Sequence, residues 1–136
     1  MSEAAGSTRQ LKERAAALTP LVIETIITLM ARKQPFSLDY EPEVKEHLRA
    51  IDSKYHSLIH DAIEEQLLFE PDTETRNRKA LDPPAPFDAT WEIRFGPNNR
   101  FRVFYVVDQD SRAVNIVAIG VKKGNRLIVG GVEIEL

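Results

Sequence analysis

The chain of 136 residues contains no cysteine. This absence excludes disulfide bonds, thiolate zinc sites and cysteine nucleophiles, and it is compatible with a reducing cytosol. A domain of this length can bury an adequate core without such cross-links. The content of 43% hydrophobic and 29% charged residues is ordinary for a globular protein.

Long apolar segments are also lacking. The best candidate, Leu21 to Met30, is interrupted by Glu24, Thr25 and Thr28 and falls well short of the roughly 20 residues that a membrane-spanning helix needs. The first residues have no basic region followed by an apolar stretch, so they do not resemble a signal peptide. We therefore expect a soluble, cytoplasmic protein with no membrane partner.

Positive charge is in deficit over the whole chain but is concentrated in its second half. The net charge is −3, yet residues 76–126 carry ten Lys and Arg against five Asp and Glu, whereas residues 1–75 carry eight against fourteen. Such asymmetry suggests a basic binding surface in the second half. An ordinary solvated surface is the alternative.

Residues 1–35 are predicted to form an N-terminal extension with one amphipathic helix. Thr19-Pro20 is typical of a helix start, and Gln34-Pro35 of a helix end. The apolar face of this helix could pack on the rest of the chain, pair with a second copy to give a homodimer, or imitate a partner's helix. Its apolar residues recur at helical spacing and comprise Leu21, Val22, Ile26, Leu29 and Met30.

Residues 36–136 are predicted to form one α+β domain. The order of elements indicates a helical hairpin packed on one face of a mostly antiparallel sheet of four or five strands, with a loop rich in proline and charge at 71–88. The expected elements are a strand at 36–40, helices at 42–51 and 53–70, strands at 91–95, 101–107 and 113–121, and a short strand or hairpin at 126–131. The buried stripe of the second helix is expected to comprise Tyr55, Leu58, Ile59, Ala62, Ile63 and Leu67.

Strand alternation separates apolar from charged side chains. Trp91, Ile93 and Phe95 share one face with Phe101, Val103, Tyr105 and Val107, which should lie under the helices. Glu92, Arg94 and Arg102 should then project from the opposite, open face. Six further basic residues could surround that face, namely Arg76, Arg78, Lys79, Lys122, Lys123 and Arg126.

Arginine suits phosphate because its planar fork donates two hydrogen bonds to two oxygens. A carboxylate among arginines, such as Glu92, could act as a base toward a ribose hydroxyl, or as a counter-ion that keeps the guanidiniums from repelling each other. A plain sheet face with cross-strand ion pairs is the third interpretation of the same pattern.

The segment Pro42 to Val121 resembles the RelE/ParE superfamily of bacterial toxin–antitoxin modules. The matching motifs, in order along the chain, are Asn77-Arg-Lys-Ala-Leu81, Trp91-Glu-Ile-Arg-Phe95, Phe101-Arg-Val-Phe-Tyr105 and Val117-Ala-Ile-Gly120. The resemblance implies a fold of one strand, two helices and a three-stranded meander. It also implies a toxin that a cognate antitoxin wraps and neutralises.

The resemblance leaves three hypotheses for function. RelE-like members cut mRNA on the ribosome without a metal, by attack of a ribose 2′-hydroxyl on the adjacent phosphate. ParE-like members inhibit DNA gyrase instead, and a toxin relic would act by partner binding alone. The nucleases usually end with Tyr or His-Tyr, whereas the stretch from Lys123 to Gly131 contains neither residue.

Carried over position by position, the resemblance assigns four catalytic residues. Arg102 falls where the nucleases keep a phosphate-contacting arginine, and Glu92 and Arg94 fall where they keep Lys or Glu and a second basic residue. Lys122 falls where a basic residue follows the Ile-Gly pair. The basic residues around the face, Arg76, Arg78, Lys79, Lys123 and Arg126, are expected to bind nucleic acid.

Neither a metal nor a cofactor is expected. His56 and His60 have the i, i+4 spacing of two zinc ligands, but no third ligand is placed by the sequence. Surface or capping histidines are the simpler interpretation. The glycines between Gly120 and Gly131 do not form the Gly-x-x-x-x-Gly-Lys pattern of a nucleotide-binding loop.

Overall fold

The computed structural model describes residues 21–26 and 34–135 and divides the chain into two units between Gln34 and Pro35. In the first unit, residues 21–26 are helical, and Leu21 and Val22 are exposed. The remainder of the expected N-terminal helix, with Leu29 and Met30, lies outside the described residues. Within the described ranges, no helix combines the length and apolar character that crossing a membrane requires.

The second unit begins with the expected strand and helical hairpin. Asp52 caps the second helical segment, because its side chain accepts a hydrogen bond from the Lys54 amide at 3.0 Å. His56 holds the two helices together, since its Nε2 lies 2.7 Å from the Leu48 carbonyl and 2.9 Å from that of Ile51. The elements are β1 (Ser37–Tyr40), α3 (Val44–Arg49), the 3₁₀ turn η1 (Ser53–Tyr55) and α4 (His56–Leu67).

Seven strands of the second unit form one sheet, more than the four or five expected. The strand order is β2-β3-β4-β5-β6-β7, all antiparallel, and β1 pairs in parallel with β5. The expectation of a mostly antiparallel α+β fold is confirmed. The strands that follow the hairpin are β2 (Arg78–Ala80), β3 (Trp91–Phe95), β4 (Phe101–Asp108), β5 (Ala113–Lys123), β6 (Arg126–Val129) and β7 (Val132–Ile134).

The prediction of a continuous loop over 71–88 was wrong at β2. The prolines of this segment stand at positions 71, 83, 84 and 86, outside residues 78–80, so the backbone amides of β2 remain free to pair with β3. Between β2 and β3 the chain turns through the short 3₁₀ segment η2 (Pro86–Asp88).

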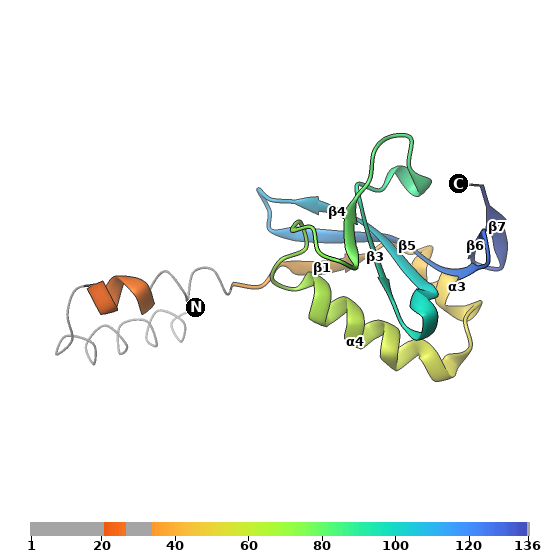
Figure 1. Cartoon of the computed structure of the whole chain (residues 1–136), viewed down its shortest axis with the longest axis horizontal. Coiled ribbons are helices and arrows are strands. Elements are labelled where there is room, and N and C mark those ends of the chain that lie inside the picture. The colour runs from red at the N-terminus through yellow and green to blue at the C-terminus, as the bar shows by residue number, and fades with distance from the viewer. Residues whose placement is uncertain (1–20, 27–33, 136) are drawn as a thin grey trace. The chain divides into compact units, whose positions relative to one another are not determined.

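The helices cover one face of this sheet, with α4 lying along it (Figure 1). Trp91 packs against the core but is only partly buried, although we expected it to be buried. Leu58, expected in the buried stripe, is exposed because it lies on the solvent side of α4. The main core comprises Phe36, Val44, Ile51, Ile59, Ile63, Leu67, Ile93, Phe101, Val103, Tyr105, Val114, Ile116 and Ile119.

The opposite face, which we call the second face, is not open throughout. Phe104 projects from it as alternation predicts, but it is buried in a smaller apolar cluster with Ala89, Ala118, Leu127 and Val129. Phe87 of η2 lies over Phe104, with a ring separation of 6.4 Å. The expectation of a wholly open face was therefore wrong, because η2 and β6 supply apolar side chains that cover part of it.

His47 of α3 closes a gap along the edge of β5. On that edge β1 pairs with residues 113–116 and β6 with residues 120–123. Between them the Ile119 amide donates a hydrogen bond to Nδ1 of the buried His47 at 3.3 Å. Nδ1 can accept this bond only while it is unprotonated. Burial lowers the pKa of His47, although the nearby Glu43 carboxylate acts in the other direction.

We expect the free energy of unfolding to decrease as the pH is lowered from about 7.5 to about 5. The pKa of His47 in the folded state is lower than its ordinary value of 6.5, so the unfolded chain binds the proton more tightly. The stabilisation that neutral His47 contributes is complete above the pKa that His47 has in the unfolded chain. It is lost as the pH falls through the pKa of His47 in the folded state. Urea unfolding across this range measures it. His47→Asn is the control, because an amide oxygen can accept from Ile119 without titrating. Equal pH slopes for the two proteins would contradict the assignment.

Candidate functional site

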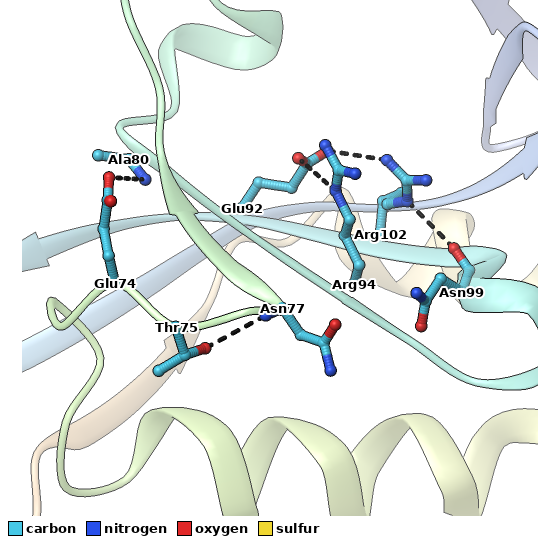
Figure 2. Close-up of polar contacts among 8 residues, drawn as sticks. All are labelled: Glu74, Thr75, Asn77, Ala80, Glu92, Arg94, Asn99 and Arg102. Atoms are coloured by element: carbon cyan, nitrogen blue, oxygen red, sulfur yellow. Dashed lines mark hydrogen bonds and ion pairs between the residues drawn. The ribbon is translucent and has the colours of Figure 1, made fainter.

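Strand register brings three of the predicted catalytic side chains together. Arg94 of β3 is paired directly with Arg102 of β4, and Glu92 lies two residues before Arg94 on the same face. Figure 2 shows the Glu92 carboxylate joined by dashed lines to the guanidinium groups of both Arg94 and Arg102. Arg94 is further held to the β2 side of the sheet, because its amide donates to the Asn77 carbonyl at 2.9 Å.

Glu92 is engaged by both arginines. Its Oε1 lies 3.3 Å from Arg94 Nε, and its Oε2 lies 3.5 Å from Arg102 Nη1. The side chains of Glu92 and Arg102 are only 9% and 12% exposed, whereas that of Arg94 is 39% exposed. Burial lowers the pKa of Arg102 from its ordinary value; the Glu92 carboxylate raises it and the Arg94 charge lowers it. Glu92 therefore compensates two guanidiniums that would otherwise repel each other across the strand pair.

Arg102 also lines a cleft of about 540 Å³ at this end of the sheet. Its Nε donates to the Asn99 carbonyl at 3.2 Å, as Figure 2 shows. The β3–β4 turn can present this carbonyl because Gly96, Asn98 and Asn99 all adopt positive φ, which glycine and asparagine tolerate best. The cleft is lined by Asn98, Arg100, Arg102, Val121, Lys122, Lys123 and Gly124.

The charged side chains among the described residues that line this cleft are all positive. Four of its seven described lining residues are cationic and none is a carboxylate. The backbone of Lys122 lies beside that of Arg100, since the Lys122 amide donates to the Arg100 carbonyl at 2.7 Å. A concave surface that gathers several cations attracts anions, and arginine and lysine are the usual ligands of phosphate. The cleft is the part of the described chain best suited to bind phosphate.

Of the remaining basic residues that we predicted from the sequence, Lys123 lines the cleft and the others are scattered. Lys79 of β2 is exposed opposite Glu92 and so lies on the second face, and Arg76 is exposed in the preceding loop. Lys123 and Arg126 form the last pair of the β5–β6 ladder, and by alternation their side chains lie on the other side of that ladder from Lys122. Arg126 also faces Glu133 at 3.6 Å.

The placement of Arg78 at the edge of the open face was wrong. Arg78 is 6% exposed and turns toward the helical layer. Its Nη2 donates to the Gln66 carbonyl at 2.7 Å and to Gln66 Oε1 at 3.0 Å, and its Nη1 donates to the Thr73 carbonyl at 3.0 Å. It holds the last turn of α4 and the following loop. Arg78 points toward the helices because β2 pairs with β3, and this pairing places Arg78 on the same face as Ile93.

Sequence reasoning missed Arg100. It precedes β4 by one residue and belongs to none of the motifs that we used. Its two-residue spacing from Arg102 was the available signal. The described residues contain no group of three His, Asp or Glu side chains that could hold a metal ion.

Removal of the Glu92 carboxylate should destabilise the domain. We expect Glu92→Ala to lower the free energy of unfolding by about 1–3 kcal/mol, the usual effect of leaving partly buried charges without their partner. Glu92→Gln should lower it less, because the amide oxygen still accepts a hydrogen bond. Urea unfolding at neutral pH measures both variants. Unchanged stability of Glu92→Ala would show that the arginines do not need this counter-ion.

Comparison with known proteins identifies the family. No curated protein sequence matches the chain. Among solved structures, the RelBE2 toxin–antitoxin complex from Mycobacterium tuberculosis aligns with a TM-score of 0.49 and 16% identity, over 65% of this chain and 99% of that one. The model of the family described as the ParE toxin of the type II toxin–antitoxin system, parDE, matches residues 38–125, from the second residue of β1 to just beyond the end of β5. Because this match covers more than half of the sequence, the chain belongs to the ParE toxin family of type II toxin–antitoxin systems.

Proposed function

We propose that this toxin inhibits growth by binding the phosphate backbone of mRNA on the ribosome through the second face and its cleft. The observation that carries the proposal is the cleft itself, in which Arg102 and Lys122 stand with two further cations and no described carboxylate. A guanidinium that is already oriented stabilises the charge that develops on a phosphate when an adjacent 2′-hydroxyl attacks it. Arg102, with Lys122 beside it, is the proposed contact to that phosphate.

Glu92 fits the role of counter-ion better than that of base. Both of its oxygens lie within 3.5 Å of guanidinium nitrogens. Both oxygens are therefore already engaged by cations, an arrangement that suits a counter-ion. We therefore propose that Glu92 orients Arg94 and Arg102 and that cleavage, where it occurs, depends chiefly on electrostatic stabilisation by Arg102 and Lys122.

Non-catalytic inhibition of DNA gyrase is the second candidate. Two observations favour it: the matching family model is that of ParE toxins, and the only carboxylate beside the arginines in the described site is engaged by both of them. The same cationic surface would then contact a protein target or its bound DNA. A relic that acts by partner binding alone would show no toxicity.

A cognate antitoxin is the proposed partner in each case, and the cytoplasm the proposed location. The family comprises toxins of type II toxin–antitoxin systems, in which a second protein is the antitoxin. Growth inhibition should therefore be reversed when the neighbouring open reading frame is co-expressed.

We expect Arg102→Ala to abolish growth inhibition in a bacterial host while the domain stays folded, because Arg94 still engages Glu92. Arg49→Ala is the matched control, because Arg49 lies on α3, outside the cleft, and pairs with Glu46 on the surface. Mapping of mRNA ends on ribosomes and a gyrase supercoiling assay identify the target. New mRNA ends that disappear in Arg102→Ala support cleavage. Gyrase inhibition without new ends supports the second candidate, and growth inhibition that persists in Arg102→Ala contradicts both.

We also propose that residues 36–136 are the toxin domain and that residues 1–35 are an extension that pairs with its copy in a homodimer. The exposed Leu21 and Val22 give the described part of this helix an apolar surface. Burying even about 300 Å² of such surface stabilises a complex by several kcal/mol before the opposing entropy, at ~25 cal/mol per Å². Deletion of residues 1–34 should therefore convert a dimer to a monomer in light scattering. An unchanged mass would rule out this route to a dimer, and a gain in toxicity would instead support imitation of the antitoxin.

A further inference from the structure

Arg100 occupies the wall of the cleft next to Arg102. It follows the β3–β4 turn, and its carbonyl accepts from the Lys122 amide at 2.7 Å. The backbone of Arg100 is thus tied to the strand that carries Lys122. Both Arg100 and Arg102 contribute to the lining of the same cleft.

The guanidinium of Arg100 is held by an aromatic ring. It lies over the Tyr55 ring at 5.6 Å, and its Nη1 donates to the Tyr55 hydroxyl at 3.4 Å. Tyr55 is itself fixed, because its ring packs on the buried Phe101 at 5.1 Å. Cation–π contact of this kind restrains an arginine without neutralising it.

Arg100 and Arg102 therefore differ in how their charges are balanced. Arg102 is paired with Glu92, whereas no ion pair between Arg100 and a carboxylate is present among the described residues. The two hydrogen bonds of the Arg100 guanidinium, to Tyr55 and to the Pro97 carbonyl, are both 3.4 Å long. A guanidinium has five donors, so donors of Arg100 remain for a ligand.

We propose that Arg100 forms a second phosphate subsite beside the Arg102 and Lys122 subsite, and that the ligand class of the cleft is a single-stranded polynucleotide with consecutive phosphates. This inference rests on the proposed function, since it assumes that the cleft binds RNA. Two arginines held independently, one by a carboxylate and one by an aromatic ring, suit a ligand that carries its charge at regular intervals.

The test is the salt dependence of binding to a ten-nucleotide single-stranded RNA, followed by fluorescence anisotropy with the full chain. Each phosphate contact on a single strand contributes about 0.7 to the slope of log K against log salt. Arg100→Ala should lower the slope by about 0.7 and weaken binding about tenfold. Arg100→Lys should keep the slope because it keeps the charge. Arg49→Ala, which removes an arginine outside the cleft, should change neither quantity by a comparable amount.

The outcomes separate this inference from the proposed function. If Arg102→Ala lowers the slope and Arg100→Ala does not, RNA binding stands and the second subsite is overturned. If the wild-type chain shows no salt-dependent binding to the RNA, the proposed function fails and the subsite fails with it. If Arg100→Ala does not fold, as judged by its thermal midpoint, Arg100→Gln takes its place with the same expected slope.

Discussion

The described domain depends on β5, whose two edges are both occupied. One edge pairs with β4 along its length, and the other is shared by β1, His47 and β6. This one strand therefore determines which side chains of the middle of the sheet lie on each face. Ile116 and Ile119 of β5 enter the helical core, and Ala118 and Gly120 face the other way. At Gly120 a Cβ would lie 2.9 Å from Val129 Cγ2 and 3.0 Å from the Ile128 carbonyl, so close pairing of β6 requires glycine there. On the opposite edge of β5, the hydrogen bond from the Lys122 amide to the Arg100 carbonyl brings Lys122 to the cleft.

Much of this arrangement could be predicted from period-two alternation. The sequence separates Ile93 and Val103 from Glu92 and Arg102 without any knowledge of register, and the burial of the core agrees with that separation. Alternation could not show what covers the second face. Phe104 is buried there by side chains that reach it from η2 and β6, and contacts between such distant segments leave no periodic signal.

The candidate site also contains some residues that the sequence could place and others that it could not. Glu92, Arg94 and Arg102 meet because they lie on the same face of paired strands, which sequence can predict once the strands are recognised. Arg78 could not be placed, because its direction depends on β2, which is three residues long and is surrounded by loop-forming residues. Arg100 is positioned by Tyr55, 45 residues earlier in the chain, and nothing in either local sequence indicates that contact.

The cations of the cleft fall into two electrostatic classes, and the difference bears on how a phosphate would bind. The charge of Arg102 is balanced by the Glu92 carboxylate, 3.5 Å away. A phosphate that approaches Arg102 must therefore compete with this carboxylate or accept hydrogen bonds from the guanidinium N–H groups that remain available. Arg100 rests on an aromatic ring, and Lys122 belongs to a wall without described carboxylates, so neither must give up an ionic partner. The uncompensated cations should therefore dominate the initial attraction of a polyanion to a chain whose net charge is −3. Arg102, oriented by Glu92, would then place a preorganised charge at the reacting phosphate, as electrostatic stabilisation requires.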